Sequence, residues 1–150
     1  MSIFRKNTSF TKLDGKILFI NASENANGTI ARMGRELLEG KDYQEIDLSK
    51  LKIYQLSQHF PDDQFDQVLQ AIAEADTIIL GAPIYWHSIS GYAKTFYERL
   101  SRDSDGILPG KKIGIFIHGS APADAVAATE NLMHWFTQVE GMINLGVQVG

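Results

Sequence analysis

Residues 77–91 have the sequence TIILGAPIYWHSISG, in which an apolar run leads to a proline and then to two large aromatic residues. The run at 77–80 predicts a buried strand. Because Pro83 lacks an amide hydrogen, we expect pairing to stop there and the chain to turn outward at the carboxyl end of the strand, where open α/β sheets bind ligands. Tyr85 and Trp86 in such a turn indicate a flat aromatic ligand. The alternative is a hydrophobic loop packed under a neighbour or into a dimer contact.

The rest of the chain repeats this alternation of short apolar runs and amphipathic stretches. Further strands are predicted at residues 16–20, 43–48, 113–117 and 142–149. Helices are predicted from a cap at Asn27 or Thr29 to Gly40, from caps at Asp62 and Asp63 through Ile72, near 92–100, and at 124–139. Parallel strands need long right-handed crossovers, so the pattern predicts a doubly wound, five-stranded parallel α/β sheet with helices on both faces. We expect one domain at 16–150 after an N-terminal extension at 1–15.

The composition excludes several classes of protein. Zero cysteines exclude disulfides, thiolate nucleophiles and cysteine-bound clusters, so redox chemistry would need a bound cofactor. A net charge of −4 without a Lys/Arg cluster argues against a nucleic-acid partner. No apolar run approaches the roughly 20 residues of a membrane span, and the amino terminus lacks a signal-peptide core, so we expect a cytoplasmic protein without membrane contact. The histidines show no metal-ligand spacing, so no metal is expected.

Three loops follow predicted strands, at residues 21–29, 82–91 and 118–124, and the strand order 2-1-3-4-5 would bring them to one crevice. The first loop carries short hydrogen-bonding side chains and a glycine just before a helix: Ser23, Asn25, Asn27, Gly28 and Thr29. Backbone amides at a helix start carry partial positive charge and would bind a terminal phosphate without lysine or arginine. The alternative is an ordinary capped loop between a strand and a helix.

Together these segments resemble the flavodoxin-like superfamily of NADPH-dependent FMN reductases and quinone reductases. The likeness rests on Ser23 with Asn27-Gly28-Thr29, on the loop Pro83-Ile84-Tyr85-Trp86-His87-Ser88-Ile89-Ser90-Gly91, and on Lys94 with Glu98-Arg99. It spans residues 16–149. The resemblance implies a flavodoxin-like fold, FMN as the cofactor and NADPH or NADH as the co-substrate.

The resemblance also implies roles for individual residues. The FMN phosphate would be held by Ser23, Asn25, Asn27, Gly28 and Thr29. The isoalloxazine and ribityl chain would be lined by Pro83, Ile84, Tyr85, Trp86 and His87, and the other side of the ring would be closed by His118, Gly119 and Ser120. Hydride would pass from NAD(P)H to the flavin and then to a quinone, an azo compound or free flavin, with no general acid required. Tyr85, Trp86 and His118 are expected to shape the pocket for this second substrate.

The chain departs from the family pattern in two places. The arginine common in the phosphate loop is missing, with Glu24 and Asn25 near its place, so a lower FMN affinity is expected. The final helix of the relatives is absent after the last predicted strand, which would leave a sheet face near the first strand bare. We expect a homodimer or higher homo-oligomer to cover that face and complete the flavin pocket, or residues 1–14 to fold over it.

Two other functions stay open at this point. The first is a flavodoxin-type electron carrier, although such carriers need a strongly acidic docking face that a charge of −4 does not supply. The second is an interaction module that keeps the fold and binds no flavin. Oxidation of NADPH without a partner protein would exclude the carrier, and failure to bind FMN would favour the module.

Overall fold

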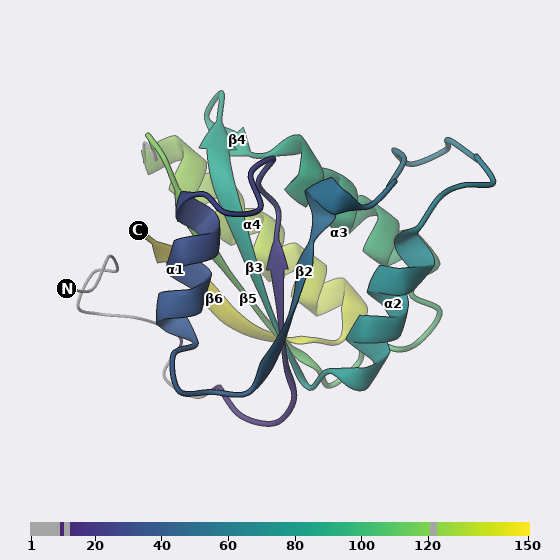
Figure 1. Ribbon diagram of the computed structural model, residues 1–150, viewed down its shortest axis with the longest axis horizontal. Helices are drawn as coiled ribbons and strands as arrows, with labels where there is room; N and C mark the ends of the chain where they lie inside the picture. The colour runs from purple at the N-terminus through teal and green to yellow at the C-terminus, as the bar shows by residue number, and fades with distance from the viewer. Residues whose placement is uncertain (1–9, 11–12, 121–122) are drawn as a thin grey trace.

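The computed structural model describes residue 10 and residues 13–120 and 123–150. Its strands are β1 (Ile17–Asn21), β2 (Tyr43–Asp47), β3 (Thr77–Tyr85), β4 (Ser88–Ile89), β5 (Lys112–His118) and β6 (Ile143–Val149). Its helices are α1 (Thr29–Leu37), α2 (Phe65–Glu74), α3 (Gly91–Asp103) and α4 (Ala123–Glu140), with a 3-10 turn η1 (Leu48–Lys50) after β2. Every predicted strand and helix is therefore present (Figure 1).

The five parallel strands run in the order β2-β1-β3-β5-β6, which confirms the predicted order 2-1-3-4-5. The register is regular where the sheet is most buried, with Phe19 of β1 between Glu45 of β2 and Ile79 of β3. Because all five strands point the same way, the loops after β1, β3 and β5 leave the sheet at one edge.

Strand β3 is longer than the sequence indicates. The prediction that pairing stops at Pro83 is wrong, since Pro83 is still in register with His118 of β5. The carbonyl of Pro83 accepts a hydrogen bond from the Ser90 amide (3.0 Å) on the side away from β5. Strand β1 has already ended there at Asn21, so the missing amide hydrogen of Pro83 removes no bond of the parallel sheet.

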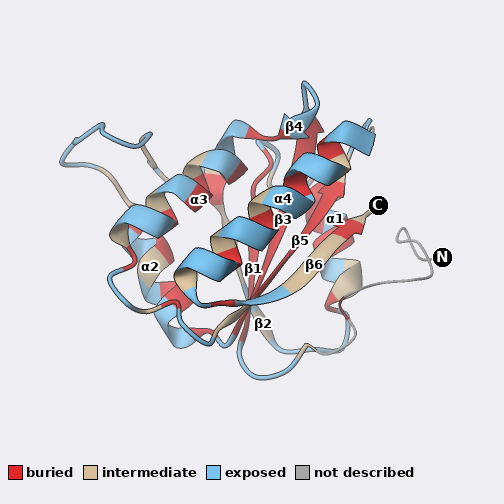
Figure 2. Ribbon diagram, turned by 180° about the vertical axis from the view of Figure 1, so that it is seen from behind, coloured by how far each residue is buried: buried red, intermediate tan, exposed pale blue. Residues whose placement is uncertain are grey.

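The helices cover the two faces of the sheet unequally. Side chains alternate along β1, so that Leu18 and Ile20 pack with α2, α3 and α4 whereas Ile17 and Phe19 pack with α1. Figure 1 is seen from the α1 side, and Figure 2 shows the opposite side with α3 and α4 in front of the sheet. Among the described residues, none of the helices combines the length and the apolar character needed to cross a bilayer.

The bare sheet face predicted near the first strand is not found at β1. Ile17 and Phe19 are buried there, in a cluster that includes helix α1 and Phe10. The ring of Phe10 lies over Gly114 of β5, where a Cβ atom would come within 2.6 Å of it. Much of the predicted extension at 1–15 lies outside the described residues, and on this face the edge strand leaves Ile143 half exposed.

The contact between α1 and β1 depends on Gly34. A Cβ atom at this position would overlap the ring of Phe19, which is fully buried. We expect Gly34→Ala to destabilise the fold by about 2 kcal/mol in urea unfolding, because overpacking outweighs the roughly 1 kcal/mol of helix propensity that alanine adds. Gly91→Ala, at the first residue of α3, is the matched control: its Cβ atom meets nothing within 4 Å, so stability should stay equal or rise slightly. Equal stability of Gly34→Ala and the wild type would contradict this packing.

Candidate functional site

The loops after β1, β3 and β5 border one cavity of about 500 Å³ at the carboxyl edge of the sheet. Its lining residues are Ser23, Glu24, Asn25, Gly28, Thr29, Ile30, Arg32, Pro83, Ile84, Tyr85, His118 and Gly119. The structure thus brings together most of the residues predicted from the sequence. Those that do not line the cavity are Asn27, Trp86, His87 and Ser120.

The first loop is fixed by Asn21, a residue that the sequence reasoning did not single out. Asn21 is fully buried at the end of β1; its Oδ1 accepts from the Ser23 amide (3.0 Å), and its Nδ2 donates to Asp47 Oδ1 (3.2 Å). Ser23 Oγ then accepts from the Asn25 amide (3.2 Å), and Asn25 Oδ1 accepts from the Asn27 amide (3.0 Å). These side-chain oxygens act as acceptors and hold the loop in one shape, and the hydroxyl of Ser23 can still donate to a ligand in the cavity.

Helix α1 begins beside the cavity without a side-chain cap. The cap position is Gly28, so the prediction that Asn27 or Thr29 caps the helix is wrong. The first amides of a helix have no partner within the helix and point along its axis. With no side chain bonded to this end among the described residues, the amides of the first turn are available to an anion.

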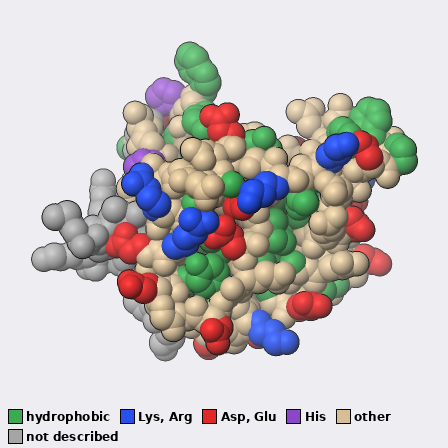
Figure 3. All heavy atoms as spheres, viewed as in Figure 1, with side chains coloured by type: hydrophobic (Ala, Val, Ile, Leu, Met, Phe, Trp, Pro, Cys, Tyr) green, Lys and Arg blue, Asp and Glu red, His purple; other side chains and the backbone are tan. Residues whose placement is uncertain are grey.

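Arg32 supplies a positive charge at the same place. It lies in the first turns of α1, lines the cavity, and donates from Nη2 to Thr29 Oγ1 (3.2 Å). Figure 3 shows Lys and Arg side chains gathered over α1. Arg32 is not among the predicted site residues, although a spacing of three along a helix places it on the face of Thr29.

The second loop is a tight hairpin that the sequence did not predict. Strand β4 pairs antiparallel with the end of β3, with Tyr85 opposite Ser88, and the two-residue tip is Trp86-His87. Both tip residues have positive φ, 49° and 62°, a conformation that usually selects asparagine or glycine. Trp86 is 96% exposed and does not line the cavity, so its predicted contact with a ring stays a prediction.

Long-range bonds hold this hairpin against its unfavourable tip. His87 Nδ1 donates to Asp124 Oδ2 at the start of α4 (3.0 Å), and this hydrogen bond keeps the pKa of Asp124 below its usual range. Ser90 Oγ donates to the Ala22 carbonyl (2.7 Å) and accepts from the Ala93 amide (3.2 Å), so it caps α3 and joins it to the first loop. The hairpin is therefore positioned by both neighbouring loops.

The third loop closes the cavity opposite the first. His118 ends β5 and its Nδ1 donates to the carbonyl of Gly150 (3.1 Å). Gly119 has a φ of 130°, and a Cβ atom there would lie 3.3 Å from the Ile84 carbonyl oxygen. The loop after β5 thus approaches the end of β3 closely, and together with the positive φ this favours glycine at this point. Among the described residues, no group of three or more His, Asp or Glu is placed to hold a metal ion.

A salt bridge behind the site ties the segment 51–64 to α3. Arg99 donates from Nη1 and Nη2 to the two carboxylate oxygens of Asp63 (2.8 and 2.9 Å) and from Nε to Asp103 (2.8 Å). These bonds lower the pKa of Asp63 and raise that of Arg99. The prediction that Asp62 and Asp63 cap α2 is wrong, since Gln64 takes the cap position, although Asp63 Oδ2 accepts from the Phe65 amide (3.1 Å).

Comparison with known proteins finds a matching family and a curated relative. Residues 15–150 match the family described as NADPH-dependent FMN reductase. A curated relative, YwqN of Bacillus subtilis (strain 168), is named as an NAD(P)H-dependent FMN-containing oxidoreductase and is 27% identical over 95 residues. That match covers 58% of this chain and 52% of YwqN, so the matched region spans about half of the curated relative.

Solved structures share the fold. The Trp repressor binding protein of Bacillus subtilis superposes with a TM-score of 0.72 at 22% identity, over 89% of this chain and 85% of that one. An NADH:FMN oxidoreductase named EMOB, in its apo form, gives a TM-score of 0.63 at 23% identity, over 89% of this chain and 73% of that one. These likenesses confirm the flavodoxin-like architecture of the sheet and its helices.

Proposed function

The chain belongs to the NADPH-dependent FMN reductase family, and we propose that its cavity at the carboxyl edge of the sheet binds FMN for the oxidation of NAD(P)H. FMN and NAD(P)H are the cofactor and the co-substrate of this family. One observation carries the proposal for this chain: the uncapped start of α1 and the guanidinium of Arg32 border a cavity whose other walls come from β3 and β5.

The residues of the first loop fit the phosphate of FMN. The amides of the first turn of α1 and the side chains of Ser23, Thr29 and Arg32 offer donors at one end of the cavity. Charge-assisted hydrogen bonds of this kind are about twice as strong as neutral ones. Arg32 therefore supplies the positive charge that the missing loop arginine would provide, which compensates for the lower FMN affinity expected from its absence. Asn25 and Asn27 act by holding the loop in shape.

The other end of the cavity fits the ring and the ribityl chain. Pro83, Ile84 and Tyr85 line this end of the cavity, together with His118 and Gly119 from the neighbouring strand β5 and the loop after it. Ile84 is buried and gives the cavity an apolar base, whereas Tyr85 is half exposed and lies at the rim toward solvent. Ser120, Trp86 and His87 lie at the same rim outside the lining, and we propose that they meet the ring or the second substrate when these are bound.

Bound FMN would supply the redox chemistry, taking up hydride and passing electrons on to an acceptor. The chain's own contribution is binding and orientation. The close approach of Gly119 to Ile84 and the Ser90 bonds to Ala22 and Ala93 fix the three loops relative to one another. Tyr85 and His118 shape the space for the second substrate, and no side chain is required to donate a proton.

We propose a quinone, an azo compound or free flavin as the acceptor, and the cytoplasm, where nicotinamide nucleotides are regenerated, as the location. A small molecule is favoured over a protein partner because a net charge of −4 gives little electrostatic steering toward a basic docking face. The built cavity, with donors at one end and apolar walls at the other, favours a flavin enzyme over a flavin-free interaction module.

The experiment that tests this function is a spectral titration. The protein is reconstituted with FMN, freed of excess flavin, and its visible spectrum is recorded anaerobically before and after NADPH or NADH is added. Bleaching of retained flavin is expected, and free FMN at the same concentration serves as the control for slow uncatalysed reduction. Retained flavin that stays oxidised would instead indicate an electron carrier, and loss of all flavin would indicate an interaction module.

We also propose a homodimer, formed through the outer faces of α3 and α4. A groove between these helices exposes Trp135 (60%) and Val139 (77%), and Leu132 and Phe136 line it. Its rim alternates in charge, with Lys94 and Arg102 beside Glu98 and Glu140. A surface with apolar residues at its centre and both signs of charge at its rim is complementary to a second copy of itself.

The variant Trp135→Glu tests this dimer. A carboxylate in the middle of an apolar interface is costly to bury, so light scattering should show a dimer for the wild type and a monomer for the variant. Gln70→Glu, on the exposed face of α2, is the control and should stay dimeric. A monomeric wild type at micromolar concentration would contradict the proposal.

A further inference from the structure

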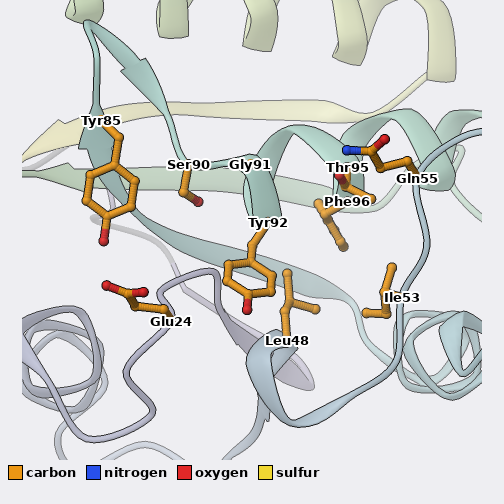
Figure 4. Close-up of a pocket in the computed structure, with 10 residues that line it drawn as sticks. All are labelled: Glu24, Leu48, Ile53, Gln55, Tyr85, Ser90, Gly91, Tyr92, Thr95 and Phe96. Atoms are coloured by element: carbon orange, nitrogen blue, oxygen red, sulfur yellow. The ribbon is translucent and has the colours of Figure 1, made fainter.

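A second cavity, which we call the side slot, lies next to the flavin cavity (Figure 4). It has a volume of about 360 Å³ and is walled by Leu48 and Ile53 on one side and by Tyr92 and Phe96 of α3 on the other. Figure 4 shows Glu24 and Tyr85 facing each other at one end of the side slot. These two residues also line the flavin cavity, so the two spaces meet there.

The interior of the side slot is apolar. Leu48 and Phe96 at its base are each 1% exposed. The buried hydroxyl of Ser90 already donates to the Ala22 carbonyl and accepts from the Ala93 amide. A ligand group inside the side slot therefore gains little from hydrogen bonding at its base and is stabilised by apolar contact.

The wall at Ile53 is held in place by its neighbours. The Lys52 amide donates to Gln64 Oε1 (2.8 Å), and the Gln64 amide donates to the Lys52 carbonyl (2.7 Å). One residue beyond Ile53, the Tyr54 amide donates to Asp63 and its carbonyl accepts from Arg99 (3.0 and 2.9 Å). The side slot is thus a preformed feature rather than a gap beside a loose loop.

Charge limits what the side slot accepts. Glu24 stands at its junction with the flavin cavity, so an anionic group that passes the junction would be repelled by the carboxylate. This disfavours the phosphates of a nicotinamide nucleotide. A neutral, apolar group that reaches past Tyr85 meets no such barrier.

We propose that the side slot binds an apolar substituent of the electron acceptor while the redox-active ring of the acceptor lies in the flavin cavity. This inference rests on the proposed function, since it names the chemical class of the acceptor: a flat, reducible ring carrying a neutral hydrocarbon chain. The side slot and the flavin cavity meet at Glu24 and Tyr85, and the hydrocarbon chain would pass from one to the other there.

The test compares menadione with a menadione that carries one geranyl chain. In the wild type the geranyl compound should have a KM lower by at least about tenfold, which the burial of roughly two methylene groups already provides. The variant Thr95→Phe places a ring in the side slot from α3 and should reduce this preference to within about twofold. Gln70→Phe adds the same ring to the exposed face of α2 and should keep the preference.

Two further measurements separate the possible failures. The affinities of both quinones for each variant are measured by calorimetry without NADPH, so the side slot is tested even where no turnover occurs. Ile53→Phe fills the side slot from the opposite wall and replaces Thr95→Phe if that variant does not fold. Equal affinity of the wild type for the two quinones, or a preference that survives the filled side slot, would overturn the proposal. Reduction of neither quinone with the binding preference intact would count against the proposed function alone.

Discussion

The variant Gly28→Asp should bind FMN at least about 100-fold more weakly than the wild type, because an added carboxylate takes up the amides that the phosphate needs and repels it. Gly28 caps α1 with φ −89° and ψ −156°, an extended conformation that aspartate also adopts. Aspartate is a preferred cap, so the free energy of unfolding without flavin should stay equal or rise by a few tenths of a kcal/mol. Fluorescence titration with FMN and urea unfolding measure the two effects.

Gly28→Ala separates the charge from the added bulk. A Cβ atom at this position would lie 3.0 to 3.2 Å from the side chain of Asn25, which a small movement relieves. The alanine variant should therefore lose less than about tenfold in FMN affinity, because the amides stay available. An unchanged FMN affinity in Gly28→Asp would show that the phosphate binds elsewhere.

The second large effect is expected from Asp63→Asn. This change leaves Arg99 without its bidentate partner, and breaking a fully buried pair of this kind costs about 3–5 kcal/mol. The side chains of Arg99 and Asp63 are 13% and 19% exposed, so we expect a smaller loss of about 2–3 kcal/mol in the free energy of unfolding at neutral pH. Urea unfolding measures it, and the side slot should lose its preference for a hydrocarbon chain.

The loss should also depend on pH in a defined direction. The hydrogen bonds from Arg99 lower the pKa of Asp63 in the folded protein. In the unfolded chain the pKa of this carboxyl is about 4, so the pair stabilises the fold fully above that pH. Its stabilisation decreases as the pH falls below that value. The difference in the free energy of unfolding between the wild type and Asp63→Asn should therefore become smaller in acid. Asp62→Asn, at a more exposed neighbour bonded to Lys52 and Tyr54, is the control and should show a much smaller loss. A gap that persists unchanged in acid would contradict the assigned role of Asp63.

The order of the sheet could be predicted from the sequence because it depends on local patterns. The central parallel strands are short apolar runs such as 17–20 and 113–117, and the stretches between the strands carry helical spacing. The convergence of the loops after β1, β3 and β5 then follows from the strand order alone. Arg32 was within reach too, since it lies one helical turn from Thr29.

Other features depend on contacts that no local pattern reveals. The hairpin tip at Trp86-His87 lacks the Asn-Gly signal of a tight turn, and His87 is bonded there to Asp124, which is 37 residues away in sequence. Arg99 and Asp63 are 36 residues apart, so the local pattern near α2 predicts only a helix cap for the acidic pair. Tertiary bonds override local preference at both places.

The most direct test of the account is a calorimetric titration of the wild-type protein with FMN and with riboflavin, which differ only in the phosphate. If the start of α1 and Arg32 hold that phosphate, FMN should bind at least about 100-fold more tightly than riboflavin, as expected from one or two charge-assisted hydrogen bonds. Equal affinities for the two flavins would contradict the assignment of the first loop as the phosphate site.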